Sequence, residues 1–177
     1  MGAESRLKEL GITLLAPSKP VGNYVPGVRV GNLLFLSGHG PVRDGAPLFR
    51  GKVGRDLTTA EAYKVAREVG IGLLGSARHV LGSLDKVRRV VKVLGMVNAV
   101  EDFGEQPKVI NGFSDLMVEV FGENGRHARS AVGMGSLPLS IPVEIEMILE
   151  VESGTQPAGY KAAARPRGAG KARRARR

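Results

Sequence analysis

The segment VEIEMILEV, residues 143–151, alternates apolar and polar side chains along almost its whole length. Its odd-numbered positions, from Val143 to Val151, are all apolar, whereas Glu144, Glu146 and Glu150 occupy three of the even-numbered positions. Successive side chains of a β-strand point to opposite faces, so the pattern predicts a strand with one apolar and one largely charged face. Such a strand needs a hydrophobic layer on one side of its sheet.

Two apolar stripes at helical spacing can supply that layer. The first follows Thr58 and Glu61, which match a capping box, and the second begins near Pro107 and ends at Gly122. Three glycines within residues 70–75 are expected to let the first helix lie close against the sheet. The stripes are Ala62, Ala66, Val69, Leu73, Ala77, Val80 and Leu84, then Val109, Phe113, Leu116, Met117, Val120 and Phe121.

Further strands are predicted on both sides of these helices. Residues 24–38 form a hairpin turning at Gly31-Asn32, and residues 41–54 form a weaker one. The apolar run 86–98 predicts a central strand covered on both faces, and residues 127–135 another strand. The fold class is therefore α+β, a mixed sheet with both helices on one face. The other face is partly apolar, which favours oligomerisation.

Length and composition predict one domain with extensions. The boundaries are an N-terminal extension, residues 1–23, packed on the body, an α+β domain, 24–153, and a basic tail, 154–177. The net charge is +9, and eight Lys or Arg within residues 158–177 leave about +1 for the body, since 9 − 8 = 1. The tail is expected to be disordered, serving either as a solubilising extension or as a nucleic-acid contact.

Several classes of protein are disfavoured by what the sequence lacks. There is no cysteine, and the three histidines have no metal-ligand spacing, so we expect neither a metal nor a cofactor. No apolar run reaches the ~18 residues of a membrane helix, so no membrane partner is expected. The first residues carry two acids and no apolar core, which disfavours a secretory signal and is consistent with a cytoplasmic protein.

Arg129 is the residue best suited to bind an acid. In a strand it shares a face with the small Ala131 and Gly133, and we expect this face to point away from the helices. A guanidinium beside that space could hold a carboxylate by two hydrogen bonds, although an ordinary surface arginine is the alternative. Glu144 or Glu146 could position an attacking water or hold Arg129, or simply form a solvated strand face.

Tyr24, Asn111 and the loop Ser37-Gly38-His39-Gly40 are weaker candidates. The tyrosine could cap a pocket or pack at a strand start, and the amide of Asn111 needs a partner at the border of the helical stripe. The loop exposes backbone amides without phosphate-loop spacing. The isolated His39 is weak support for a catalytic base.

Five segments of the sequence are informative because of their order along the chain. They are Tyr24-Val25-Pro26-Gly27-Val28, Gly31-Asn32-Leu33-Leu34-Phe35-Leu36-Ser37-Gly38, Val109-Ile110-Asn111, Ala128-Arg129-Ser130-Ala131-Val132 and Ile141-Pro142-Val143-Glu144-Ile145-Glu146. In this order they resemble the reactive-intermediate-deaminase family, also called YjgF-like or L-PSP endoribonuclease-like. The resemblance spans about residues 24–151, and the order is more specific than any one segment.

The resemblance implies a fold like bacillar chorismate mutase, assembled as a homotrimer with pockets between subunits. It implies hydrolysis of 2-imino or 2-enamino acids without metal or cofactor, with Arg129 binding the substrate carboxylate and Glu144 placing the water. The other matching pocket positions are Tyr24, Ser37, Gly38 and Asn111. The alternatives are an endoribonuclease or RNA-binding translation inhibitor, and a trimer that binds small ligands without catalysis.

This sequence also departs from the family pattern. Ala131 replaces a common cysteine, and His127 stands where a proline is usual. Together with the N-terminal extension, these departures indicate a longer, less characterised subgroup.

Overall fold

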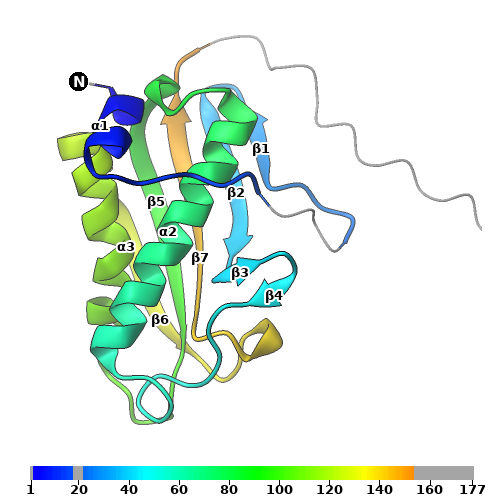
Figure 1. The fold of residues 1–177 in the computed structure, drawn as a ribbon, viewed down its shortest axis with the longest axis vertical. Coiled ribbons are helices and arrows are strands. Elements are labelled where there is room, and N and C mark those ends of the chain that lie inside the picture. The colour runs from blue at the N-terminus through cyan, green and yellow to red at the C-terminus, as the bar shows by residue number, and fades with distance from the viewer. Residues whose placement is uncertain (1, 18–21, 154–177) are drawn as a thin grey trace, which may run out of the picture.

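A computed structural model describes residues 2–17 and 22–153, so the predictions for the basic tail lie outside the described residues. Its main sheet has five strands in the order β1-β2-β7-β5-β6 (Figure 1). All neighbouring strands are antiparallel except β5 and β6, which are parallel, so the sheet is mixed as predicted. The strands are β1 (Gly27–Val30), β2 (Leu33–His39), β5 (Val87–Asn98), β6 (Ala128–Met134) and β7 (Val143–Val151).

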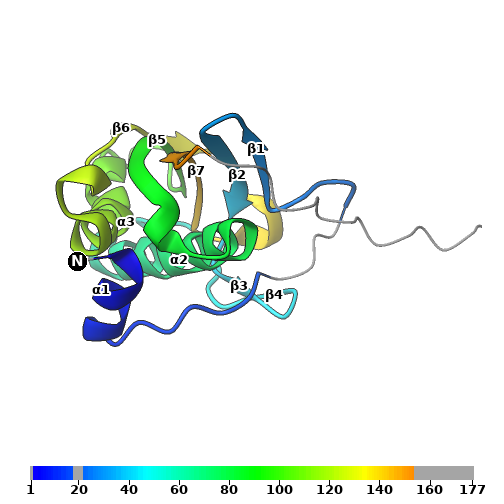
Figure 2. The same cartoon turned by 90° about the horizontal axis from the view of Figure 1, so that it is seen from above.

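The helices α2 (Thr59–Leu81) and α3 (Gln106–Phe121) lie together on one face of this sheet (Figure 2). The short helix α1 (Ala3–Glu9) and the chain after it lie on the outer side of the helix layer (Figure 2). Leu7 and Leu14 of this N-terminal segment are buried in the common core. The smaller elements are strands β3 (Val42–Arg43) and β4 (Ala46–Pro47) and the 3-10 helices η1 (Leu84–Lys86), η2 (Gly122–Gly125) and η3 (Pro138–Ser140).

Strand β7 has the two faces that its sequence predicts. Its five odd-numbered side chains are buried beneath the helices, Glu146 is exposed, and the other even-numbered side chains are half-buried. Because β7 pairs with β2 on one side and β5 on the other, its register determines which residues of both neighbours face the core.

The predicted turns and the helix cap also form. In the first hairpin Gly31 has a φ of 60°, and in the second Asp44 and Gly45 have φ values of 51° and 79°. Both turns therefore use the left-handed backbone conformation that short hairpins require. Thr58 and Glu61 make both hydrogen bonds of the capping box at the start of α2.

Two packing expectations were wrong. The glycines of α2 do not face the sheet: Gly70 packs on Leu116 and Phe113 of α3, and Gly75 lies against the Leu15 carbonyl of the N-terminal segment. Within one chain β5 is covered on one face only, and Leu94 is half-buried on the other. Apolar residues on both faces of a strand cannot indicate whether a second layer belongs to the same chain.

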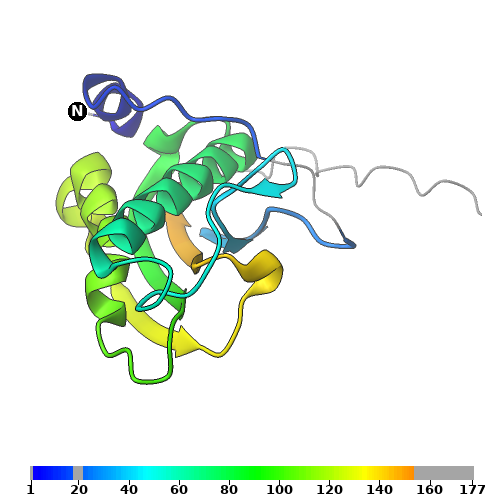
Figure 3. The same cartoon turned by 60° about the horizontal axis from the view of Figure 1, so that its bottom comes forward.

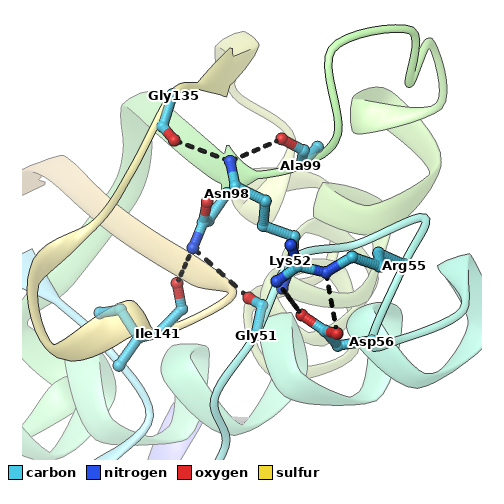
Figure 4. A network of polar contacts seen from close by, with 8 residues as sticks. All are labelled: Gly51, Lys52, Arg55, Asp56, Asn98, Ala99, Gly135 and Ile141. Atoms are coloured by element: carbon cyan, nitrogen blue, oxygen red, sulfur yellow. Dashed lines mark hydrogen bonds and ion pairs between the residues drawn. The ribbon is translucent and has the colours of Figure 1, made fainter.

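A group of hydrogen bonds made by Asn98 and Lys52 lies at the end of the sheet where β5 and β6 end (Figure 4). The buried Asn98 amide nitrogen donates to the carbonyls of Ile141, at 3.2 Å, and Gly51, at 3.4 Å. The Lys52 ammonium donates to the carbonyls of Ala99, at 3.0 Å, and Gly135, at 2.7 Å. These contacts join the loop before α2 to the turn before β7, which Figure 3 shows side by side.

The two long helices come into close backbone contact at Gly112 of α3. A Cβ atom added there would collide with the backbone carbonyl of Tyr63 in α2, whereas one added at the exposed Gly72 would contact nothing within 4 Å. Gly112 is therefore required for helix contact, while Gly72 only reduces helix propensity.

We expect G112A to destabilise the protein by about 3 kcal/mol, because backbone atoms must move apart to admit the methyl group. G72A, the matched control, should stabilise by about 1 kcal/mol through helix propensity. Urea unfolding of both variants measures the difference. Equal free energies of unfolding for G112A and the unmodified protein would disprove the close approach.

Candidate functional site

Arg129 lies on the helix side of the sheet, so the predicted face of β6 was wrong. In the parallel pairing with β5, Arg129, Ala131 and Gly133 are opposite the buried Val93, Gly95 and Val97. Ser130, Val132 and Met134 occupy the open face, where Val132 and Met134 are exposed. The larger apolar side chains therefore face away from the core, because β6 is an edge strand and α3 covers it only partly.

Neutral groups of α3 hold the Arg129 guanidinium. Its Nη1 donates to Asn111 Oδ1 at 3.0 Å and to Ser114 Oγ at 2.9 Å, and its Nη2 has a longer contact, 3.4 Å, with the Pro107 carbonyl. His127 extends the group, since its Nε2 lies 3.1 Å from Ser114 Oγ. We call Asn111, Ser114, His127 and Arg129 the Arg129 cluster.

The charge of this guanidinium is not neutralised by a direct ion pair among the described residues. Partial burial lowers the pKa of Arg129, with a smaller opposing effect from Asp115, but an arginine remains protonated. Within the described ranges, Nε–H and a second Nη2 hydrogen have no partner. They form the edge of the guanidinium that suits a carboxylate in a bidentate arrangement.

Glu144 lies on the opposite, open face, beside Gly38. A Cβ atom added at Gly38 would collide with Glu144 Oε1, so a larger residue there would displace the carboxylate from its position beside β2. Burial, followed by the neighbouring Glu146, raises the pKa of Glu144. A half-buried carboxylate of raised pKa is suited to exchange protons with a reacting molecule. Ser37, Gly38 and Glu144 are the Glu144 cluster.

His39 positions the backbone of this cluster from the helix side of the sheet. Its Nδ1 lies 2.7 Å from the Ser37 carbonyl and its Nε2 lies 2.6 Å from Oγ of Ser76, a residue of α2 that is 0% exposed. The register between β2 and β7 shifts between Leu36 and His39, so this bond to α2 fixes the irregular end of β2. Burial lowers the pKa of His39, with a smaller opposing effect from its bond to Ser37.

The structure brings together only some of the predicted site residues. Asn111 joins Arg129, and Ser37 and Gly38 join Glu144, while Tyr24 is 54% exposed near the start of β1. The Arg129 and Glu144 clusters lie on opposite faces of the sheet, so neither Glu144 nor Glu146 holds Arg129 within one chain. A site that uses both clusters requires more than one subunit.

Two serines of the site were missed from the sequence. Ser114 lies three residues after Asn111, which places both on one side of α3 and was a usable signal. Ser76 interrupts the apolar face of α2, and a buried hydroxyl needs a partner. His39 and His127 were undervalued because their serine partners are distant or unremarkable in sequence.

Residues 2–17 and 22–153 contain no cluster of three His, Cys, Asp or Glu able to hold a metal ion. No helix in the same ranges is both long and apolar enough to cross a membrane.

The family model described as "YjgF/chorismate_mutase-like, putative endoribonuclease" matches residues 4–150. This chain belongs to the YjgF family. The resemblance inferred from the ordered segments is thereby confirmed. The family match includes most of the N-terminal segment, and the predicted domain boundary at residue 24 remains a prediction.

Several known proteins are similar to this chain over most of their length. Protein TCP17 of Trypanosoma cruzi is 41% identical over 150 residues, which cover 84% of this chain and 94% of that protein. The 2-iminobutanoate/2-iminopropanoate deaminase of Dermatophagoides farinae is 31% identical, covering 82% of this chain and 98% of its own. The crystal structure of Atu1372 from Agrobacterium tumefaciens, a protein of unknown function, is 46% identical with a TM-score of 0.78, covering 85% and 92% of the two chains.

Replacing His39 with glutamine should make the free energy of unfolding depend less on pH at acidic pH. The pKa of His39 in the folded protein lies below its ordinary value of 6.5, so its stabilising contribution is present above pH 6.5. That contribution is lost as the pH falls through the lowered folded-state pKa. Urea unfolding from about pH 7.5 to about pH 4.5 measures the effect. The exposed His79 provides the control H79Q, and identical profiles for H39Q and the unmodified protein would contradict the assignment.

Proposed function

We propose that this YjgF protein hydrolyses small 2-imino or 2-enamino acids to 2-oxo acids and ammonia. The observation that carries the proposal is the Arg129 guanidinium, which is held by neutral acceptors and keeps a free edge for a carboxylate. A cation already paired with a protein carboxylate would bind an acid poorly. The similarity to a 2-iminobutanoate/2-iminopropanoate deaminase supports the same substrate class.

The complete site is proposed to form between subunits of a homotrimer. The open face of the sheet is apolar enough to associate, since Val28, Val30, Phe35, Val132 and Met134 are exposed on it. Association through this face would bring the Glu144 cluster of one subunit toward the β6 edge of its neighbour, which carries the Arg129 cluster. This arrangement would unite two groups that one chain keeps apart.

The proposed chemistry needs few groups because an imine carbon is already electrophilic. Arg129 binds the carboxylate, and Glu144 accepts a proton from water as its oxygen attacks the imine carbon. The tetrahedral intermediate then carries a hydroxyl and an amino group on one carbon. Glu144 returns its proton to that nitrogen and then accepts the hydroxyl proton as the carbon–nitrogen bond breaks, which releases ammonia and leaves the 2-oxo acid.

We expect R129A to lose about a hundredfold in kcat/KM, because bidentate contacts to the carboxylate disappear. The assay couples the protein to an amino-acid oxidase that generates imino acids and measures the acceleration of ammonia release. R126A is the matched control, because Arg126 is paired with Glu123 in η2, outside the Arg129 cluster. Equal activity of R129A and the unmodified protein would remove Arg129 as the anchor.

Glu144 should determine the acid limb of the pH–activity profile. Its pKa is raised above 4.5, and the ionised form is the base, so activity should rise as the pH increases through this raised value. E144Q should lose about a hundredfold in kcat, and its pH–activity profile should no longer show the acid limb. E146Q, which removes the neighbouring charge, should keep activity and move the limb to lower pH. An acid limb that persists in E144Q would contradict this role.

An RNA-directed activity is the second candidate, because the family description includes an endoribonuclease. Its support is weaker in the described residues, where His39 and His127 are each hydrogen-bonded to a serine and a backbone carbonyl. A trimer that binds 2-oxo acids through Arg129 without turnover is a third, non-enzymatic possibility, which the coupled assay distinguishes. A cytoplasmic location and a tail that contacts nucleic acid remain predictions from the sequence.

A further inference from the structure

His127 is bonded at both ring nitrogens beside the Arg129 guanidinium. Its Nδ1 lies 2.6 Å from the Gly125 carbonyl, and its Nε2 lies 3.1 Å from Ser114 Oγ. The ring is half-buried and meets the ring of Phe113 edge-on, with centroids 6.1 Å apart. These contacts hold the imidazole in one orientation.

The direction of each hydrogen bond follows from the partners. A carbonyl only accepts, so Nδ1 carries the hydrogen, and Nε2 of the neutral ring must then accept from the Ser114 hydroxyl. This leaves the lone pairs of Ser114 Oγ for the Arg129 Nη1, 2.9 Å away. His127 therefore orients the serine that orients the arginine.

The charges around His127 come from several elements. On β6, which begins directly after His127, the positive charge of Arg129 lowers the pKa of His127. On α3 the Asp115 carboxylate accepts a hydrogen bond from the Tyr63 hydroxyl and raises the pKa of Arg129. Glu123 of η2 forms an ion pair with Arg126, the residue that follows this helix. On β5, Lys92 donates to Ser130 on the opposite face of the sheet. Arg129 is thus the charged group most directly linked to His127.

We propose that His127 is a positioning residue that adjusts the affinity of Arg129 for carboxylates through its protonation state. In the neutral form it holds Ser114 as an acceptor for Arg129. In the protonated form Nε2 becomes a donor to Ser114 and a second positive charge stands beside the guanidinium. The inference rests on the proposed carboxylate site but concerns binding, so it is separable from turnover.

The sign of the effect follows from linkage. Burial lowers the pKa of His127, the bond to Gly125 opposes this, and repulsion by Arg129 lowers it further. A bound carboxylate offsets that repulsion, so binding should raise the pKa of His127, and the same ligand should bind more tightly as the pH falls. The protonated His127 and a carboxylate bound at Arg129 would be close neighbours near the protein surface. We therefore expect the Kd of the carboxylate to fall about threefold between about pH 7.5 and about pH 5.5.

The experiment uses the full-length protein and 2-oxobutanoate as the probe. The three histidines give three Cε1–H signals in NMR spectra, which H39Q, H79Q and H127Q assign. Titrations with and without the probe report the pKa of His127, and calorimetry at both pH values reports Kd. We expect a raised pKa on binding, and in the probe-free protein we expect R129A also to raise it by removing the repulsion.

The glutamine variant separates positioning from folding. H127Q keeps a neutral acceptor for Ser114 but cannot be protonated, so it should match the unmodified protein at about pH 7.5 and fail to tighten at about pH 5.5. E144Q should retain the threefold change, which excludes the other titrating group of the site. The same tightening in H127Q, or a His127 pKa indifferent to both the probe and R129A, would overturn the inference.

The two proposals fail in different ways. Imine hydrolysis that depends on Arg129, without any shift in His127, would overturn only the role of His127. A ligand-induced shift without ammonia release would overturn only the proposed hydrolysis. No binding of 2-oxobutanoate by the unmodified protein at either pH would overturn both.

Discussion

The pairing of β7 with both β2 and β5 is the constraint on which the rest of the structure depends. Its strict alternation buries five apolar side chains beneath α2 and α3 and turns Glu144 to the opposite face. Through the shared register, β5 then directs Arg129 of β6 toward the helices. A slip of one residue would exchange the two faces, so the core and both candidate clusters are determined together.

The sheet keeps Arg129 and Glu144 apart on its two faces. A basic and an acidic group kept on opposite faces cannot neutralise each other within a chain, so each stays available to a ligand. The hydrogen bonds of Asn98 and Lys52 hold the turn that leads into β7, and the Ile141 carbonyl that accepts from Asn98 lies three residues before the half-buried Glu144. Stability of this end of the sheet is therefore coupled to the geometry of the proposed site.

His39 and His127 share one local arrangement. Each imidazole contacts a backbone carbonyl two residues earlier through Nδ1 and a helix serine through Nε2. The two hydrogen bonds of His39 connect the end of β2 to α2 near the Glu144 cluster. Those of His127 connect the segment before β6 to α3 within the Arg129 cluster. Neutral hydrogen bonds serve this purpose well, because they orient the backbone without neutralising Arg129 or Glu144.

The sequence by itself determined the elements whose signals are local: the alternating strand β7, the capping box at Thr58, both hairpins and the α+β class. It also identified Arg129, Asn111 and Glu144 as candidate residues. Only the tertiary structure decided which face Arg129 occupies, which serines orient the histidines, and where the α2 glycines pack. Alternation specifies that two faces differ, whereas the partner covering each face depends on strand register and on contacts between residues distant in the chain.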